Sequence, residues 1–190
     1  MSHRFSLAVV IGAALQSATS AGLMAETVEL PARKSGHWEI RMVHETPAGS
    51  PDTVIQACID EATDKDMMRG GLSMAKEMCS QTDMRREGSA IVIDGTCTMG
   101  TMKTTSHTVI TGDFQSAYTV KITGEVDGIS ASLAGAKGPM KTAMTQKATW
   151  LGVECPAEMK PGDMQMPGGI KVNINDMFKK KAPQVNPQQK

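Results

Sequence analysis

Polar side chains in the middle of the chain include the residue types best suited to bind a ligand or transfer a proton. Asp83 and His107 could act together as acid and base, and Arg85 could be a further polar contact of a ligand cavity. The strand registers given below turn them toward the inside of a sheet, where charged groups need partners or a ligand. The candidate ligand-facing residues are Asp83, Arg85, His107, Tyr118, Trp38 and Trp150. In the alternative interpretation, residues 79–87 form an edge strand whose charged side chains reach solvent.

Methionine is the second residue type with possible chemistry, since the chain has 16 Met against three Phe, two Trp and one Tyr. Thioether sulfur binds soft metal ions, so Met164 and Met166 are candidates for a Cu(I) site. Met also fills cores where aromatic side chains are scarce. A second group occupies predicted inner positions or turns without interleaved His: Met99, Met102, Met140 and Met144. We therefore favour core filling, keep Met164 and Met166 as the metal candidates, and expect no cofactor.

The four cysteines indicate an oxidising compartment. They show no C-x-x-C spacing, which argues against a thioredoxin-like site and against zinc. An even number of cysteines in an exported chain predicts two disulfides, with three pairings open. A turn at Gly88 places Cys79 opposite Cys97, because each lies nine residues from that glycine. We therefore pair Cys79 with Cys97 and, by elimination, Cys58 with Cys155.

Catalysis has little support in the sequence. It contains no G-x-S-x-G, H-E-x-x-H, Walker loop or G-x-G-x-x-G motif. His37 and His44 fall on opposite faces of one predicted strand, so they cannot form a joint site. Zero net charge and an aromatic content of 3% also argue against nucleic acid binding, which needs basic surfaces and stacking platforms. The sequence therefore favours a protein that is neither an enzyme nor a nucleic acid binder.

Strands with frequent turns are expected to position these residues. Residues 37–42 alternate between polar and apolar side chains, which is typical of a half-buried strand. From residue 79 onward, glycine-containing turns follow one another at short intervals. A turn at Gly112-Asp113 would pair His107 with Tyr118, and one at Asp127-Gly128 would pair Val126 with Ile129. Both hairpins place Tyr118 on one inner face of the strand over 114–126.

A short helix is expected after the second strand, residues 53–59. Residues 60–64 supply a cap and acidic first-turn residues, and Gly70-Gly71 supplies a stop, so the helix is placed at 61–69 with a resumption at 72–77. The predicted fold is mainly β: an up-and-down antiparallel meander of about seven strands, strongly curved or barrel-like, with this one short helix.

The two ends of the chain differ from its middle. Residues 1–25 combine a basic start, a short apolar run and small residues, which predicts a signal peptide. Cleavage could follow Ala21 or Ala25, and we favour Ala25. Residues 26–155 carry a net charge of −4 and are expected to form the β-meander domain. Residues 156–190 carry +3 and are rich in Pro, Gly and Gln, so we predict a largely disordered basic tail with a helical turn near 175–181.

Several segments resemble one family. Gly36-His37-Trp38-Glu39-Ile40 resembles the G-x-W-E opening of the secreted bacterial family named domain of unknown function 3617. The Cys58 segment is similar to its C-[LI]-x-x-E stretch, and the Cys79–Cys97 hairpin, the final Leu151–Cys155 and the Met-rich character are also similar. Ala148-Thr149-Trp150 replaces the basic residues usual in that family. The resemblance covers roughly residues 33–155 and implies a periplasmic β-rich protein with no established activity.

We therefore expect a periplasmic or secreted, non-catalytic protein that holds a hydrophobic ligand or a partner chain on the concave face of its sheet. One alternative is a soft-metal protein that binds copper through Met sulfur. Another is a structural or stress-related envelope protein without a ligand. The expected partner is a small hydrophobic molecule or an envelope protein, and the chain is not expected to span a membrane.

Overall fold

The computed structural model describes residues 28–46, 49–128 and 138–181. The strands are β1 (Gly36–Thr46), β2 (Thr53–Ile59), β3 (Cys79–Glu87), β4 (Ala90–Met99), β5 (Met102–Gly112), β6 (Ala117–Asp127), β7 (Met140–Gly152), β8 (Asp163–Gln165) and β9 (Lys171–Asn173). The helices are α1 (Glu61–Met78), the 3-10 turn η1 (Pro167–Gly169) and α3 (Ile174–Lys181). The predicted signal peptide lies outside the described residues.

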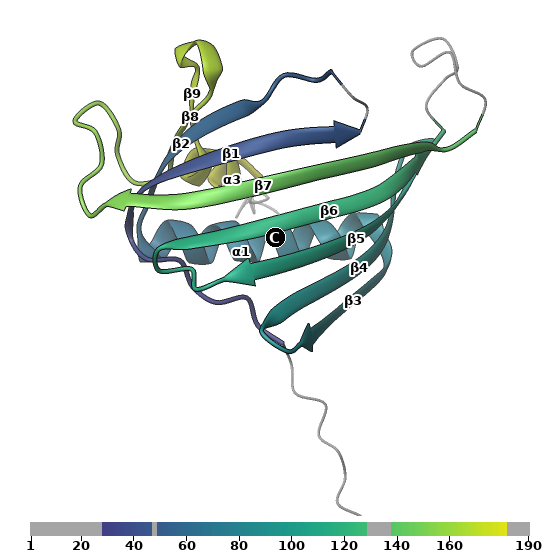
Figure 1. The fold of residues 1–190 in the computed structure, drawn as a ribbon. Helices are drawn as coiled ribbons and strands as arrows, with labels where there is room; N and C mark the ends of the chain where they lie inside the picture. The colour runs from purple at the N-terminus through teal and green to yellow at the C-terminus, as the bar shows by residue number, and fades with distance from the viewer. Residues whose placement is uncertain (1–27, 47–48, 129–137, 182–190) are drawn as a thin grey trace, which may run out of the picture.

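The described strands form one antiparallel sheet in the order β3-β4-β5-β6-β7-β1-β2-β8-β9. Strands β3 to β7 follow one another as a meander, and the β1–β2 hairpin joins its far side through the β1–β7 pairing. Figure 1 shows that the sheet curves around α1, which crosses its concave face. The sheet is not closed, since β3 and β9 form its two ends. The predicted fold class is confirmed in its curved form.

The core lies on the face of the sheet that contacts α1, which we call the inner face; the opposite face is the outer face. Trp38 is completely buried there, and its indole N–H donates to the carbonyl of Lys34 at 2.8 Å. Its ring lies 5.6 Å from that of Tyr118. Alternation along β1 buries Trp38 and Ile40 while Arg41 reaches solvent, as the period of two requires.

The α1 helix begins where the sequence predicts, at the Asp60 cap, whose side chain accepts from the Thr63 N–H at 2.7 Å. The predicted stop at Gly70-Gly71 is wrong, because the helix continues to Met78. Each glycine costs roughly 1 kcal/mol relative to Ala in a helix. The first half of the helix packs on the sheet, and the disulfide at Cys79 holds the end of the second half, which is largely exposed. These two attachments offset the cost of the glycines.

Both predicted disulfides are present, and they hold the two ends of α1. The Cys58–Cys155 bond lies two residues before the Asp60 cap, and the Cys79–Cys97 bond starts at the residue that follows Met78. The first bond spans 97 residues of sequence and the second spans 18. The helix is therefore tied covalently to β7's C-terminal extension at one end and to β4 at the other.

Beyond Cys79, strand β3 is shifted by one residue from its predicted register. An unbroken register from the disulfide would pair Asp83 with Ile93, but a β-bulge after Cys79 pairs Met84 with Ile93 instead. Successive side chains of a strand alternate between faces, so a one-residue shift moves every side chain to the other face. The inward orientation of Asp83 and Arg85 is wrong, and both lie on the outer face. The alternative interpretation is confirmed, because β3 is an edge strand and both side chains reach solvent.

The connection between β5 and β6 is longer than the predicted two-residue turn. Residues 113–116 join the strands, and His107 pairs with Thr123 rather than with Tyr118. The difference of five positions along β6 is an odd number, so it turns His107 to the outer face while Tyr118 stays on the inner face. The predicted opposition of His107 and Tyr118 is therefore wrong.

The side chain of Asp113 stabilises the loop between β5 and β6 through hydrogen bonds. Its carboxylate accepts hydrogen bonds from the backbone N–H groups of Gln115, Ser116 and Ala117 and from the Ser116 hydroxyl. The Ser116 hydroxyl, followed by these N–H groups, holds the pKa of Asp113 well below its usual range. Gly112 precedes it with φ 130°, and a Cβ there would lie 2.5 Å from the Cα of Tyr118. Gly112 and Asp113 therefore favour the four-residue loop 113–116 over a two-residue turn.

The strand predicted directly after Asp127-Gly128 does not pair as expected. Val126 pairs with Met140, so β6 is followed in the sheet by β7. Residues 129–137, which include Ile129, lie outside the described residues. The predicted inner positions of Met140 and Met144 are nevertheless consistent with the observed register, in which Met144 pairs with Ile122.

The prediction of a largely disordered tail is wrong for residues 156–181. Strand β8 pairs with β2, β9 pairs with β8, and α3 confirms the helical turn predicted near residues 175–181. Asp163 is buried and accepts from the Lys160 N–H and from Asn173 Nδ2, which fixes this segment against the body. Strands β8 and β9 have three residues each, which is too few to show a period of two in the sequence. They could be recognised only from the pairing of β8 with β2 and of β9 with β8.

Replacement of Asp113 by Ala is expected to lower the melting temperature at pH 7. The pKa of this carboxyl is depressed in the folded chain, so its contribution is fully present above the unfolded pKa of about 3.9 and is lost as pH falls below it. Thermal unfolding at pH 7, 4 and 2.5 should therefore show a shrinking difference between Asp113→Ala and wild type. Asp52→Ala, at an exposed position, is the control. An undiminished difference at pH 2.5 would contradict the assignment.

The two disulfides are expected to contribute unequally to stability. In the chain-entropy model, closing a loop of about 100 residues is worth about 4.7 kcal/mol and closing one of about 15 residues about 3 kcal/mol. Urea unfolding should therefore show a larger loss for Cys58→Ala/Cys155→Ala than for Cys79→Ala/Cys97→Ala. Equal losses, or a Cys58–Cys79 peptide in a non-reducing digest, would disprove this account.

Candidate ligand-binding cavity between the sheet and the helix

An apolar cavity of about 380 Å³ lies between α1 and the inner face of the sheet. This volume is within the range of about 300–1,000 Å³ that is usual for small-molecule sites. Its lining comes from the N-terminal segment, from α1 and from strands β3 to β7: Leu30, Pro31, Arg33, Asp64, Met67, Met68, Gly71, Leu72, Ala75, Thr82, Met84, Ile93, Ile110, Phe114, Tyr118, Val120 and Gln146. The cavity therefore occupies the concave face that the sequence assigns to a ligand.

Flexible apolar side chains form much of the wall. Met67 and Met68 approach from α1, and Met84 approaches from β3. Methionine has an unbranched, polarisable side chain that adapts to ligands of different shape. Leu72 also lines the cavity and is 52% exposed, so it lies where the cavity meets solvent. Such a wall favours an apolar molecule that reaches the cavity past α1.

The wall of the cavity also contains an ion pair between Arg33 and Asp64. Arg33 Nε donates to Asp64 Oδ1 at 2.5 Å, and the Arg33 backbone N–H donates to Asp64 Oδ2 at 3.1 Å. The two side chains are 11% and 3% exposed. The pair joins the segment before β1 to the first turn of α1 and leaves the cavity wall without a net charge.

The N-terminal segment, residues 28–35, is held on the sheet next to this pair. The Lys34 N–H donates to the Phe114 carbonyl at 2.9 Å, and Gln115 Nε2 donates to the Ala32 carbonyl at 3.3 Å. Phe114 in turn stacks on Tyr118 with 4.9 Å between ring centroids. The Asp113 loop therefore places an aromatic pair and Arg33 around the same end of the cavity.

Of the six ligand-facing candidates, only Tyr118 lines this cavity. Trp38 packs in the core beside Tyr118 and has no exposed surface. Trp150 donates its indole N–H to the Ser35 carbonyl at 3.1 Å, and the Lys34 ammonium lies 3.6 Å from the ring centroid. Both tryptophans thus anchor the start of β1 instead of contacting a ligand in this cavity.

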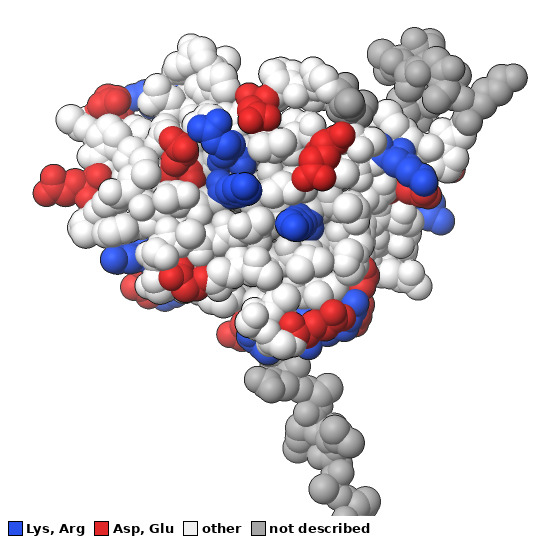
Figure 2. Space-filling model, in the orientation of Figure 1, with Lys and Arg blue, Asp and Glu red and all other residues white. Residues whose placement is uncertain are grey.

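The other three candidates meet on the outer face. Arg85 contacts Asp83, Glu87 and Asp94, and Asp94 also lies 2.6 Å from His107 Nδ1. The Arg85 guanidinium, followed by His107, lowers the pKa of Asp94, and Asp94 is the largest cause of the raised pKa of Arg85. These residues are at least 40% exposed, so they form a solvated ion network of small energetic value. Figure 2 shows red and blue atoms gathered at the lower edge of this face.

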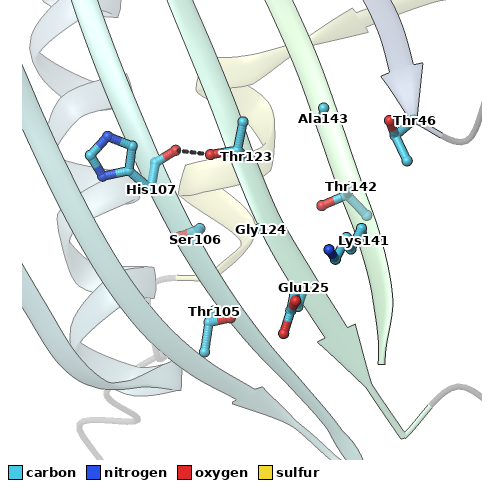
Figure 3. A pocket seen from close by; sticks show the side chains of 10 residues that line it. All are labelled: Thr46, Thr105, Ser106, His107, Thr123, Gly124, Glu125, Lys141, Thr142 and Ala143. Atoms are coloured by element: carbon cyan, nitrogen blue, oxygen red, sulfur yellow. Dashed lines mark hydrogen bonds between the residues drawn. The ribbon is translucent and has the colours of Figure 1, made fainter. Parts of the chain in front are cut away.

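A shallow depression on the outer face includes His107. In Figure 3, His107, Thr123 and Ala143 lie side by side on the neighbouring strands β5, β6 and β7. The His107 carbonyl accepts from the Thr123 hydroxyl at 3.5 Å, and no deep apolar surface surrounds the imidazole. The depression is open to solvent, and β5 directs Ser106 and His107 to opposite faces, as the sequence predicts.

The methionines proposed as metal ligands have different surroundings. Met164, in β8, packs against the hydrophobic core, whereas Met166 caps η1 and is 39% exposed. Met99 pairs with Met102 and shares the face of Ile91 and Ile93, as predicted, but it is 55% exposed because it lies at the end of the β4–β5 hairpin. Among the described residues, no group of three or more His, Cys, Asp or Glu side chains is arranged for a metal ion.

Arg33 and Asp64 are the charged cavity residues that sequence reasoning missed. Arg33 lies in a segment without recognisable periodicity, and Asp64 was interpreted only as a first-turn acid. The available signal was Asp64 on the same helical face as Met67 and Met68, at spacings of three and four residues. Its partner lies 31 residues away in the sequence, so no local pattern could identify the pair.

Residues 33–155 match the family described as "Protein of unknown function (DUF3617)". The chain belongs to this family. The DUF3617 match covers β1 to β7, both disulfides and α1, and therefore includes every element that forms the cavity except the few residues before position 33. Strands β8 and β9 and helix α3 lie beyond the match. No curated protein and no solved structure matches this chain.

Proposed function

We propose that this protein is a non-catalytic binding protein that holds a hydrophobic or amphipathic ligand between α1 and the concave face of the sheet. The observation that carries the proposal is the apolar, Met-rich cavity of about 380 Å³ on that face. A dry core would be filled by side chains, because protein interiors are close-packed and large apolar voids are costly. A cavity of this size with an exposed Leu72 at its rim is better explained by an occupant.

The cavity is suited to binding and poorly suited to catalysis. Its charged side chains are engaged with each other, and each oxygen of Asp64 already accepts from Arg33. The histidine that could transfer a proton, His107, lies on the outer face beside Asp94. Binding of an apolar molecule needs only buried surface, which contributes about 25 cal/mol per Å² of apolar area.

Export to the periplasm or beyond is part of the proposal. The two disulfides are compatible with an oxidising compartment. In the described part of the chain, no helix combines the length and apolarity needed to cross a membrane. The tripartite pattern of residues 1–25 supports removal of a signal peptide.

A bulky side chain on the cavity-facing side of α1 is expected to block ligand binding. Ala75 lines the cavity, whereas Ala62 is exposed on the same helix. Titration with the apolar fluorophore N-phenyl-1-naphthylamine should show binding to wild type and about tenfold weaker binding to Ala75→Phe, a difference of about 1.4 kcal/mol. Ala62→Phe should bind like wild type. Equal affinity of all three proteins would place the probe elsewhere, and no binding to any would favour a structural envelope protein.

Expression of the full chain in a Gram-negative host is expected to deliver a mature protein that begins at Glu26 and contains no free thiol. Cell fractionation, N-terminal sequencing and thiol titration under denaturing conditions measure these three properties. An intact Met1 terminus in the cytoplasmic fraction, with four titratable thiols, would contradict export.

A further inference from the structure

The polar part of the cavity wall restricts the chemistry of the ligand. Among the described residues that line the cavity, Arg33 and Asp64 are the only ones with charged side chains. They are joined by two hydrogen bonds, and the site as a whole is neutral. What a ligand meets there depends on which hydrogen-bonding groups of this pair remain available.

The available groups are donors of Arg33. Both Asp64 oxygens accept from Arg33, and the Asp64 side chain is 3% exposed. On the guanidinium, Nε is used by Asp64, and Nη2 lies 3.1 Å from the Met67 sulfur. A thioether is a weak acceptor for a charged donor. No oxygen of the described residues accepts from Nη1 or Nη2, and neither nitrogen is among the buried unpaired side-chain atoms of those residues. These donors are therefore accessible, and a ligand oxygen in the cavity can accept from them.

The balanced charges of Arg33 and Asp64 favour an uncharged acceptor oxygen on the ligand over a carboxylate. A carboxylate would place a second anion beside Asp64 on an apolar wall, where an uncompensated charge is costly. The oxygen of an ester, amide or ketone accepts the same hydrogen bonds and adds no net charge. The positive charge of Arg33 is thus already balanced by Asp64. Asp64 also holds Arg33 in position by accepting from its Nε and from its backbone N–H.

We infer that the ligand is an uncharged amphiphile whose apolar chain lies against the methionine wall and whose carbonyl or ester oxygen accepts from Arg33. This inference rests on the proposed function and names the ligand class of the same cavity. The neighbouring end wall agrees with it, since Phe114 and Tyr118 supply apolar ring surface beside the segment that carries Arg33.

Two probes with the same twelve-carbon acyl chain test the inference. Glycerol monododecanoate is uncharged, and dodecanoate is an anion at pH 7.5. Competition against N-phenyl-1-naphthylamine on the mature protein, below the micelle concentration of each probe, should show the monoglyceride binding about tenfold more tightly. The wild-type comparison needs no variant, so it holds whatever the variants do.

Charge variants then locate the selectivity. Asp64→Asn keeps an acceptor for Arg33 but removes the compensating anion, so the preference should move toward dodecanoate by about tenfold or more. Arg33→Met/Asp64→Asn removes both charges and the guanidinium donors, so the naphthylamine should still bind while the monoglyceride binds about tenfold more weakly than to wild type. Circular dichroism melting of each variant shows that the cavity is folded.

The outcomes separate the two proposals. Tighter binding of dodecanoate to wild type, or an unchanged preference in folded Asp64→Asn, overturns the inference about ligand class and leaves the cavity as a binding site. Failure of the naphthylamine and of both probes to bind wild type overturns the proposed function itself. Equal binding of both probes to wild type also overturns the inference, because it shows that Arg33 does not contact the head group.

Discussion

The covalent attachment of α1 at both of its ends is the constraint on which the rest of this structure depends. Cys58 lies just before the cap of the helix and is bonded to Cys155, which is 97 residues away in the sequence. Cys79 follows the last residue of the helix and is bonded to Cys97 on the neighbouring strand. A curved sheet with a helix tied across its concave face encloses space beneath the middle of the helix. The helix therefore does not need to bury a continuous apolar stripe to stay in place, and its glycine pair is tolerated.

The same arrangement separates the two faces by their chemistry. On the inner face the charges on the cavity wall are the paired Arg33 and Asp64, while solvated ion pairs such as Arg85 with Asp94 lie on the outer face. Figure 2 shows basic and acidic side chains interspersed over the outer face. An apolar wall on one side and an ordinary hydrated surface on the other follow from strand alternation.

Much of the architecture could be predicted because it depends on local patterns. Alternation around Trp38, glycine turns and an even cysteine count led to a curved meander with the correct disulfides and with α1 starting at the correct residue. The errors arose where a bulge or an irregular loop changes the register by an odd number of positions. The bulge after Cys79 and the Asp113 loop each shifted a strand by an odd number of positions, which moved Asp83, Arg85 and His107 to the outer face. Bulges and irregular loops leave weak signals in one sequence, so these residues could not be assigned to a face.

The amino-acid sequence alone determined the membership in a four-cysteine β family, the set of strands that form the meander and the excess of methionine over aromatic residues. These properties depend on composition and on periods of two or three to four residues, which are local. Only the tertiary structure decided that Tyr118 meets Arg33 and Asp64 at one cavity, and that residues 163–173 add two strands to the sheet. These contacts join parts of the chain that are distant in sequence, and a one-residue change of register is enough to make or remove them.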